Sequence, residues 1–175
     1  ILRFFNVCSS LKINNKIIGE FHNPETHLIP TIVYKNLLKK KFFIYGKNYN
    51  TIDGTCIRDY VHISDICNAI DRSVTYLFKS HKKFQIINIG SSSRNTNMEI
   101  LQKIEKITKV KSLYNIVDRR KGDVDLLICS NSKAKKILNW EPQKSNINTI
   151  IKDEIRWVKY LIKNHQKRIF KNYIK

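Results

Sequence analysis

Residues 53–65 read DGTCIRDYVHISD and place a turn, a short strand and the start of a helix one after another. The opening Asp-Gly pair predicts a turn, because glycine adopts positive φ without steric cost. Arg58, Tyr60 and His62 alternate along a strand expected over residues 58–63, which would put all three side chains on one face. The same alternation also suits an edge strand with a polar outer face. The stretch therefore predicts a strand that leads directly into a helix.

Strands and helices continue to alternate on both sides of this stretch, which indicates an α/β or α+β class. Apolar runs typical of buried parallel strands lie at both 2–7 and 85–89. Residues 12–26 are polar and rich in turn formers, so we expect a loop there. Further strands are expected over 42–45, 113–117 and 124–129. Apolar spacing predicts helices over 28–41 and 146–165. Three further helices are expected to begin at a capping residue: one at Ser64, one at Asn95 or Thr96, and a short one at Ser130 or Ser132 that ends at residue 138.

The composition excludes several classes of protein. The 175 residues are 42% hydrophobic and 27% charged, unlike a disordered or collagen-like chain. No apolar run approaches the roughly 18 residues that a membrane span requires, so we expect no membrane partner. The four cysteines form no C-x-x-C pair and have no histidine at zinc-ligand spacing. We therefore expect reduced thiols, a cytoplasmic location and no metal site.

The formal net charge of +19 raises the question of nucleic-acid binding. Lysines outnumber arginines among the 33 basic residues, and the lysines are scattered along the chain. The denser runs, at 39–41, 119–121 and 133–136, lie far apart in sequence. A binding groove would favour arginine with interleaved aromatic residues. We therefore expect a solvated lysine-rich surface and no nucleic-acid partner.

Two further segments carry residues that suit binding chemistry. Residues 119–123 read RRKGD, where arginine forks match phosphate oxygens and the aspartate can accept hydroxyl donors such as those of a ribose. An exposed charged hairpin would have the same pattern. Residues 22–30 read HNPETHLIP. His22 and His27 are five apart in an expected loop, so turn chemistry is favoured there over a metal pair.

The expected strand at 2–7 stands first in the chain. A buried parallel strand needs neighbours on both edges for its backbone donors and acceptors. The sequence also begins at Ile1 and not at a methionine. We therefore expect these residues to be the C-terminal part of a longer chain, with an N-terminal half as a partner.

Together these segments resemble the UDP-glucose (UDP-galactose) 4-epimerases of the extended short-chain dehydrogenase/reductase superfamily. The resemblance covers about residues 1 to 160, and the run DGTCIRDY-x-H-x-SD is its most specific part. The matching stretches are LRFFN at 2–6, HNPETHLIP at 22–30, FIYG-x-x-Y-x-T-x-DGTCIRDYVHISD at 43–65, NIG at 88–90, RRKGD at 119–123 and SKA-x-x-x-L-x-W at 132–140.

The resemblance implies an α/β fold: the C-terminal strands of a Rossmann-type parallel sheet plus a small mixed α/β substrate-binding domain. Residues 1–27 and 64–90 would belong to the NAD-binding Rossmann domain. Residues 28–63 and 91–165 would form the nucleotide-sugar-binding domain, and 166–175 a basic tail.

The resemblance also implies an activity, the interconversion of UDP-glucose and UDP-galactose in galactose metabolism. Such enzymes oxidise the C4 hydroxyl with tightly held NAD, rotate the 4-keto sugar and return the hydride to its other face. The resemblance therefore implies UDP-sugar substrates, an NAD cofactor and a homodimer. Two alternatives remain open: another UDP-sugar 4-epimerase, for UDP-N-acetylhexosamine or a pentose, and a non-catalytic remnant that at most binds UDP.

Site roles follow from the same resemblance, residue by residue. Phe4, Phe5 and Asn6 would contact the cofactor, with Asn6 at its junction with the sugar nucleotide. The backbone of Leu28 would contact the diphosphate or uridine. Further along the chain, backbone groups of Phe43, Ile44 and Tyr45 would bind uracil. Arg58 and Arg120 would bind the diphosphate, and Asp123 would bind the ribose. Tyr60, beside Arg58, would also contact the substrate.

The sequence departs from the family in two motifs that carry the redox chemistry. Neither a G-x-x-G-x-x-G turn, which would hold the NAD pyrophosphate, nor a Tyr-x-x-x-Lys pair is recognisable in the 175 residues. No catalytic residue is therefore assigned. We expect the 175 residues alone to have no epimerase activity.

Overall fold

The computed structural model describes residues 1–22, 24–80 and 84–164. The expected basic tail at 166–175 lies outside the described residues. Within them, no helix is both long enough and apolar enough to cross a membrane. The helices are α1 (Leu28–Leu37), α2 (Ile63–Lys79), α3 (Asn97–Thr108), α4 (Ser132–Leu138) and α5 (Ile147–Asn164).

The strands are short and pair mostly in parallel, which confirms the predicted α/β class. Four parallel pairs are β1–β8, β2–β7, β5–β10 and β6–β11, while β3–β4 and β6–β9 are antiparallel. The strand bounds are β1 (Leu2–Phe4), β2 (Asn6–Cys8), β3 (Leu11–Ile13), β4 (Lys16–Ile18), β5 (Lys41–Tyr45), β6 (Ile57–Arg58), β7 (Tyr60–His62), β8 (Ile87–Ile89), β9 (Asn95–Thr96), β10 (Leu113–Val117) and β11 (Leu126–Leu127).

The single strand predicted over 2–7 is wrong, because the chain changes partners at Phe5. The Phe5 N–H still donates to the Ile89 carbonyl of β8, at 3.0 Å, but the next N–H, that of Asn6, donates to the Asp59 carbonyl, at 3.2 Å. β1 therefore pairs with β8, and β2 pairs with β7.

The strand predicted over 58–63 is likewise two strands, β6 and β7, separated by Asp59. β6 pairs with β11 and β9, whereas β7 pairs with β2. Arg58, Tyr60 and His62 therefore do not share one solvent face. Tyr60 and His62 are both buried, which also excludes an edge strand with a polar outer face.

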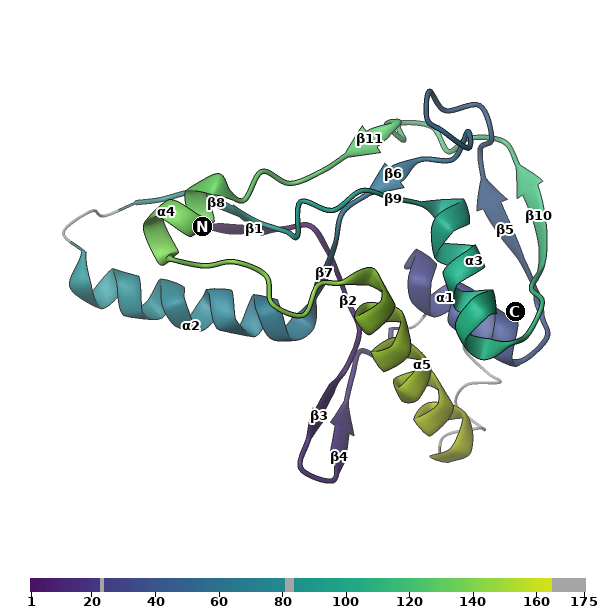
Figure 1. Cartoon of the computed structure of the whole chain (residues 1–175), viewed down its shortest axis with the longest axis horizontal. Coiled ribbons are helices and arrows are strands. Elements are labelled where there is room, and N and C mark those ends of the chain that lie inside the picture. The colour runs from purple at the N-terminus through teal and green to yellow at the C-terminus, as the bar shows by residue number, and fades with distance from the viewer. Residues whose placement is uncertain (23, 81–83, 165–175) are drawn as a thin grey trace.

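The loop predicted over 12–26 is wrong in its first part. β3 and β4 form a hairpin that projects from the rest of the molecule (Figure 1). Asn14 in its turn has φ 53°, a conformation that asparagine tolerates better than most residues. This tolerance allows the short turn between two strands that carry only three residues each.

The observed helix caps agree with the predicted ones only in part. Thr96 caps α3 as predicted, in a capping box with Glu99. The cap of α2, however, is His62, whose side chain accepts a hydrogen bond from the Ser64 N–H at 3.1 Å. The cap of α4 is Asn131, between the two predicted serines.

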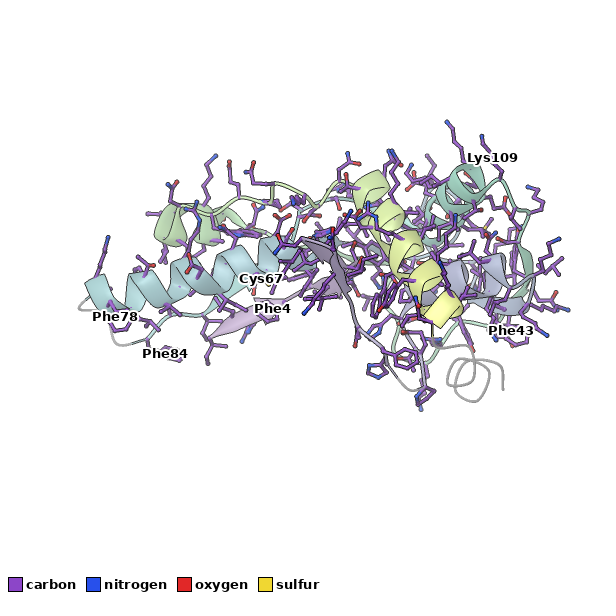
Figure 2. All side chains as sticks on the ribbon, turned by 90° about the horizontal axis from the view of Figure 1, so that it is seen from below. Phe4, Phe43, Cys67, Phe78, Phe84 and Lys109 are labelled. Atoms are coloured by element: carbon purple, nitrogen blue, oxygen red, sulfur yellow. The ribbon has the colours of Figure 1, made fainter. Side chains whose placement is uncertain are left out.

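Two hydrophobic clusters lie on either side of the β6–β7 junction. The larger cluster joins α1, α3 and α5 with β5, and the smaller one joins β7 and β8 with α2 and α4. Figure 1 shows the corresponding two halves, with α2 and α4 on one side and α1, α3, β5 and β10 on the other. Figure 2 shows Phe4, Phe78 and Phe84, all exposed, in the half that carries α2.

Candidate functional site

The loop between β10 and β11 places two arginines over two tyrosine rings. The Arg120 guanidinium lies 4.0 Å from the ring centroid of Tyr45, and that of Arg119 lies 4.0 Å from the ring of Tyr49. Tyr45 is paired with Val117, the last residue of β10, so the loop begins beside this ring. Cation–π contacts of this kind hold a guanidinium in place without using its hydrogen-bond donors.

Arg58 attaches the same loop to β6. Its Nη1 donates to the Val124 carbonyl at 2.8 Å, and its Nη2 lies 3.4 Å from the Asp123 carboxylate. The Arg58 side chain is only 13% exposed. The Tyr49 hydroxyl reaches Asp123 from the other side at 3.4 Å, and burial together with the Asp123 charge raises the pKa of Tyr49.

The loop therefore brings Arg58, Arg119 and Arg120 together with two carboxylates. Asp123 pairs with Arg58, and Asp125 pairs with Arg119 at 2.8 Å. Arg120 has its ring contact with Tyr45, and its side chain is exposed. A phosphate group could compete for these guanidiniums, because arginine forks bind phosphate oxygens bidentately.

The strand β5 offers backbone groups next to this loop. Among the described strands it pairs only with β10, so its other edge has no strand partner. Ile44 is buried in the core, whereas Phe43 is 51% exposed at the end of the molecule opposite Phe78 (Figure 2). An open edge presents N–H and C=O groups that can bind the hydrogen-bonding edge of a planar base.

Asn6 and Phe4 mark a second position, at the carboxyl end of β1. Ligands of open parallel sheets bind at this end of the strands. Phe4 is 46% exposed, and Asn6 is exposed as well. The Asn6 side-chain amide donates to the Asp59 carbonyl at 2.7 Å, which fixes the side chain against the β6–β7 junction.

The fully buried carboxylate of Asp59 holds this junction together. It accepts hydrogen bonds from the N–H groups of Ser91 at 3.0 Å, Ser92 at 2.9 Å and Cys129 at 3.1 Å, and from the Ser91 hydroxyl. Gly90 permits this approach, because a Cβ there would lie 2.6 Å from Asp59 Oδ2. The sequence reasoning assigned no role to Asp59, although it lies inside the most specific run.

A cavity of about 330 Å³ opens beside the N-terminus of α1, where Leu28 begins the helix. Its walls include Ser9, Glu25, His27 and Glu154. Glu154 is 4% exposed, and burial, followed by the charges of Glu25 and Glu20, raises its pKa to about 8. Sequence reasoning missed Glu154, although an acid on the apolar face of an expected helix was a readable signal.

The structure thus brings Arg58, Arg120 and Asp123 to one loop beside Tyr45, and places Phe4, Phe5 and Asn6 at the end of β1. Tyr60 does not join either group. It is 5% exposed and packs in the larger hydrophobic cluster.

The chain resembles known proteins in both sequence and fold. The family model described as GDP-mannose 4,6 dehydratase matches residues 3–153. A UDP-glucose 4-epimerase from Lactobacillus helveticus is 36% identical over 159 residues, which make up 90% of this chain and 47% of that protein. The chain spans about half the length of the curated relatives it matches.

Solved structures with the same fold include further epimerases. The UDP-glucose 4-epimerase from Brucella ovis in complex with NAD is 32% identical, with a TM-score of 0.81 over 90% of this chain and 48% of that one. The UDP-Glc/GlcNAc 4-epimerase from Campylobacter jejuni is 29% identical, with a TM-score of 0.71 over 91% of this chain and 47% of that one. These likenesses confirm the predicted resemblance to the 4-epimerases. Because the family model covers most of its residues, the chain belongs to the GDP-mannose 4,6-dehydratase family.

Proposed function

We propose that the chain supplies the UDP-sugar site of an NAD-dependent UDP-glucose 4-epimerase, which interconverts UDP-glucose and UDP-galactose. The observation that carries this proposal is the arginine-bearing loop held against β5 and β6. Arg58 is fixed there by Asp123 and Val124, and Arg120 by Tyr45. A diphosphate carries two negative charges and suits two guanidiniums that are already positioned.

Each part of the nucleotide has a counterpart in this arrangement. Arg58 and Arg120 would bind the diphosphate, and Asp123 would accept a ribose hydroxyl. The open edge of β5 supports a role for the backbone of residues 43–45 in binding uracil. Leu28, at the first turn of α1, would offer its backbone to the diphosphate or uridine, because N–H groups at a helix start lack intrahelical partners.

The residues at the end of β1 fit an NAD contact. Phe4 and Asn6 are exposed at the carboxyl end of a parallel strand, and Asn6 is fixed by its bond to Asp59. Phe4, Phe5 and Asn6 would border the cofactor, with Asn6 between it and the sugar. Bound NAD supplies the hydride chemistry at C4 of the sugar. This chain's residues bind and orient the sugar nucleotide.

The remaining parts of the proposal concern the complete enzyme. Residues 1–27 and 64–90 would complete a Rossmann domain with an N-terminal half, and 28–63 with 91–165 would form the substrate domain. The exposed aromatic side chains Phe4, Phe78 and Phe84 support a covered surface in that assembly. We further propose a homodimer in the cytoplasm.

A second candidate substrate is UDP-N-acetylglucosamine. Its support is the likeness to the Campylobacter jejuni enzyme, whose name includes both sugars. Assays with both UDP-glucose and UDP-N-acetylglucosamine would separate the two candidates.

The proposal is tested by complementation. UDP-galactose conversion is assayed with the 175-residue chain alone, with a separately expressed N-terminal half of a related epimerase, and with both. We expect turnover only from the mixture, since the chain has no recognisable glycine turn or Tyr-x-x-x-Lys pair. Turnover by the chain alone would contradict the assigned division of roles. A mixture that binds UDP without turnover would favour the non-catalytic alternative.

A further inference from the structure

The loop before α1 gathers two histidines and a carboxylate that the proposed UDP site does not use. Glu20, His22 and His27 each place one ligand atom so that these atoms all lie within 4.8 Å of one another. The two imidazole rings meet edge to face, with centroids 5.2 Å apart. The two histidines are five apart in sequence, a spacing that favoured turn chemistry over a metal pair, but this ring contact brings them together in space.

His27 is held by a partner that points to a ligand role. Its Nδ1 lies 3.0 Å from Glu25 Oε1, and its backbone N–H donates to the same oxygen at 2.7 Å. The Glu25 side chain is only 5% exposed, so this carboxylate is fixed behind the imidazole. When Nδ1 donates to a carboxylate, Nε2 carries the lone pair that a metal ion needs. Carboxylate–histidine pairs of this kind commonly orient metal ligands.

We propose that Glu20, His22 and His27 bind a divalent transition-metal ion of the zinc type, with Glu25 as the residue that positions His27. Two imidazoles and one carboxylate suit Zn²⁺, whereas Mg²⁺ and Ca²⁺ prefer oxygen ligands. The three ligands leave a fourth coordination position open. Glu20 and His27 also lie on the wall of a cavity whose lining includes Glu25, and the Glu25 carboxylate adds attraction for a cation.

The location distinguishes this site from the arginine loop. His27 is the residue immediately before α1, and its side chain is half exposed, so a metal ion can reach it from solvent. A bound ion would join Glu20 and His22 to His27 and fix the chain that leads into Leu28. The inference rests on these side chains alone and does not depend on the proposed epimerase activity.

The test is a calorimetric titration of the 175-residue chain with ZnCl₂, in a buffer that does not bind zinc. We expect one zinc ion per chain and loss of that binding in the double variant His22→Ala/His27→Ala. Glu25→Gln should weaken binding about 10- to 100-fold, as expected for loss of a carboxylate that orients a ligand. Circular dichroism shows whether each variant remains folded.

Two controls separate this site from thiol binding. Cys67→Ser removes an exposed free thiol and should leave the affinity unchanged. Titration with Co²⁺ should show no cobalt–thiolate charge-transfer absorption, because the proposed ligands are nitrogen and oxygen. Three outcomes would each overturn the proposal. They are equal zinc affinity in the chain and the double variant, absence of stoichiometric binding, and a thiolate band that accounts for the bound cobalt.

Discussion

The carboxylate of Asp59 accepts a hydrogen bond from the backbone N–H of Cys129, 3.1 Å away and 70 positions later in the chain. The same carboxylate accepts from Ser91 and Ser92. Asp59 thereby ties the β6–β7 junction to the segments that follow β8 and β11. A single buried acid joins strands that belong to different small sheets.

The first prediction concerns this acid. Asp59→Asn should lower the free energy of unfolding by roughly 2–4 kcal/mol, because an amide NH₂ replaces an acceptor among fixed N–H donors. Urea unfolding at neutral pH measures the change. Asp71→Asn, an exposed position on α2, removes the same charge and should cost less than about 0.5 kcal/mol. Equal losses in both variants would contradict the structural role of Asp59.

The second prediction concerns the diphosphate. Arg58→Ala and Arg120→Ala should each weaken UDP binding to the complete enzyme by about 1.5–3 kcal/mol, on the order of ten- to a hundredfold. Calorimetry with UDP measures this loss. Lys121→Ala, in the same loop, serves as the charge-matched control and should change affinity less. Unchanged affinity in both arginine variants would remove the loop from the site.

The two arginine variants should also differ from each other. Arg58 is mostly buried and donates to Val124, so Arg58→Ala should lower stability as well as affinity. Arg120 is exposed, so its replacement should affect affinity with little change in unfolding. Urea unfolding of the two variants side by side checks this separation.

The third prediction concerns pH. Burial raises the pKa of Glu154 to about 8, so between about pH 4.5 and pH 8 the folded chain binds more protons at this position than the unfolded chain. This group's contribution to stability therefore falls as pH rises across that interval. Glu154→Gln should remove this slope. The free energy of unfolding at pH 8, taken relative to that at pH 5, should therefore be higher in the variant than in the parent chain by an amount on the order of a few kcal/mol.

Unfolding is measured in urea at both pH values, with a chelator present so that no metal ion shifts the result. His62 has the opposite sign: burial lowers its pKa, so its contribution is lost as pH falls below about 6.5. A Glu154→Gln variant with the same slope as the parent chain would contradict the assignment.

The fourth prediction concerns the net charge of +19. If the lysines form a solvated surface, duplex DNA should bind weakly, without sequence preference, and be released at moderate salt. Fluorescence anisotropy with labelled duplexes across a salt series measures this. Tight, sequence-dependent binding near ~150 mM salt would contradict our assignment of the surface.

Sequence reasoning succeeded where local spacing decides the structure. The apolar period of α5 and the helix cap at Thr96 are properties of neighbouring residues, and both are present in the structure. It failed at Phe5 and Asp59, because the break in each strand depends on hydrogen-bond partners far along the chain.

The candidate site was predictable to the extent that its residues lie within recognisable runs. Arg58, Arg120 and Asp123 could be named, but the ring contacts of Arg119 and Arg120 could not, since Tyr45 and Tyr49 come from a distant segment. The approach of Glu20, His22 and His27 to one another was missed for a different reason. Their spacing in sequence does not report the distances between their side chains in space.

The single-residue connections at Phe5 and Asp59 have a consequence for motion. A hinge needs a few residues that are free to change their backbone angles. Here the Phe5 N–H donates to Ile89 of β8, the Asn6 N–H donates to Asp59, and the Asp59 carboxylate accepts from Ser91 just after β8. The two halves of the molecule should therefore move as one rigid body when a ligand arrives. The loop between β10 and β11 is also held, by the Arg58–Val124 hydrogen bond and the Arg120–Tyr45 contact, so a ligand would meet a site that is already formed.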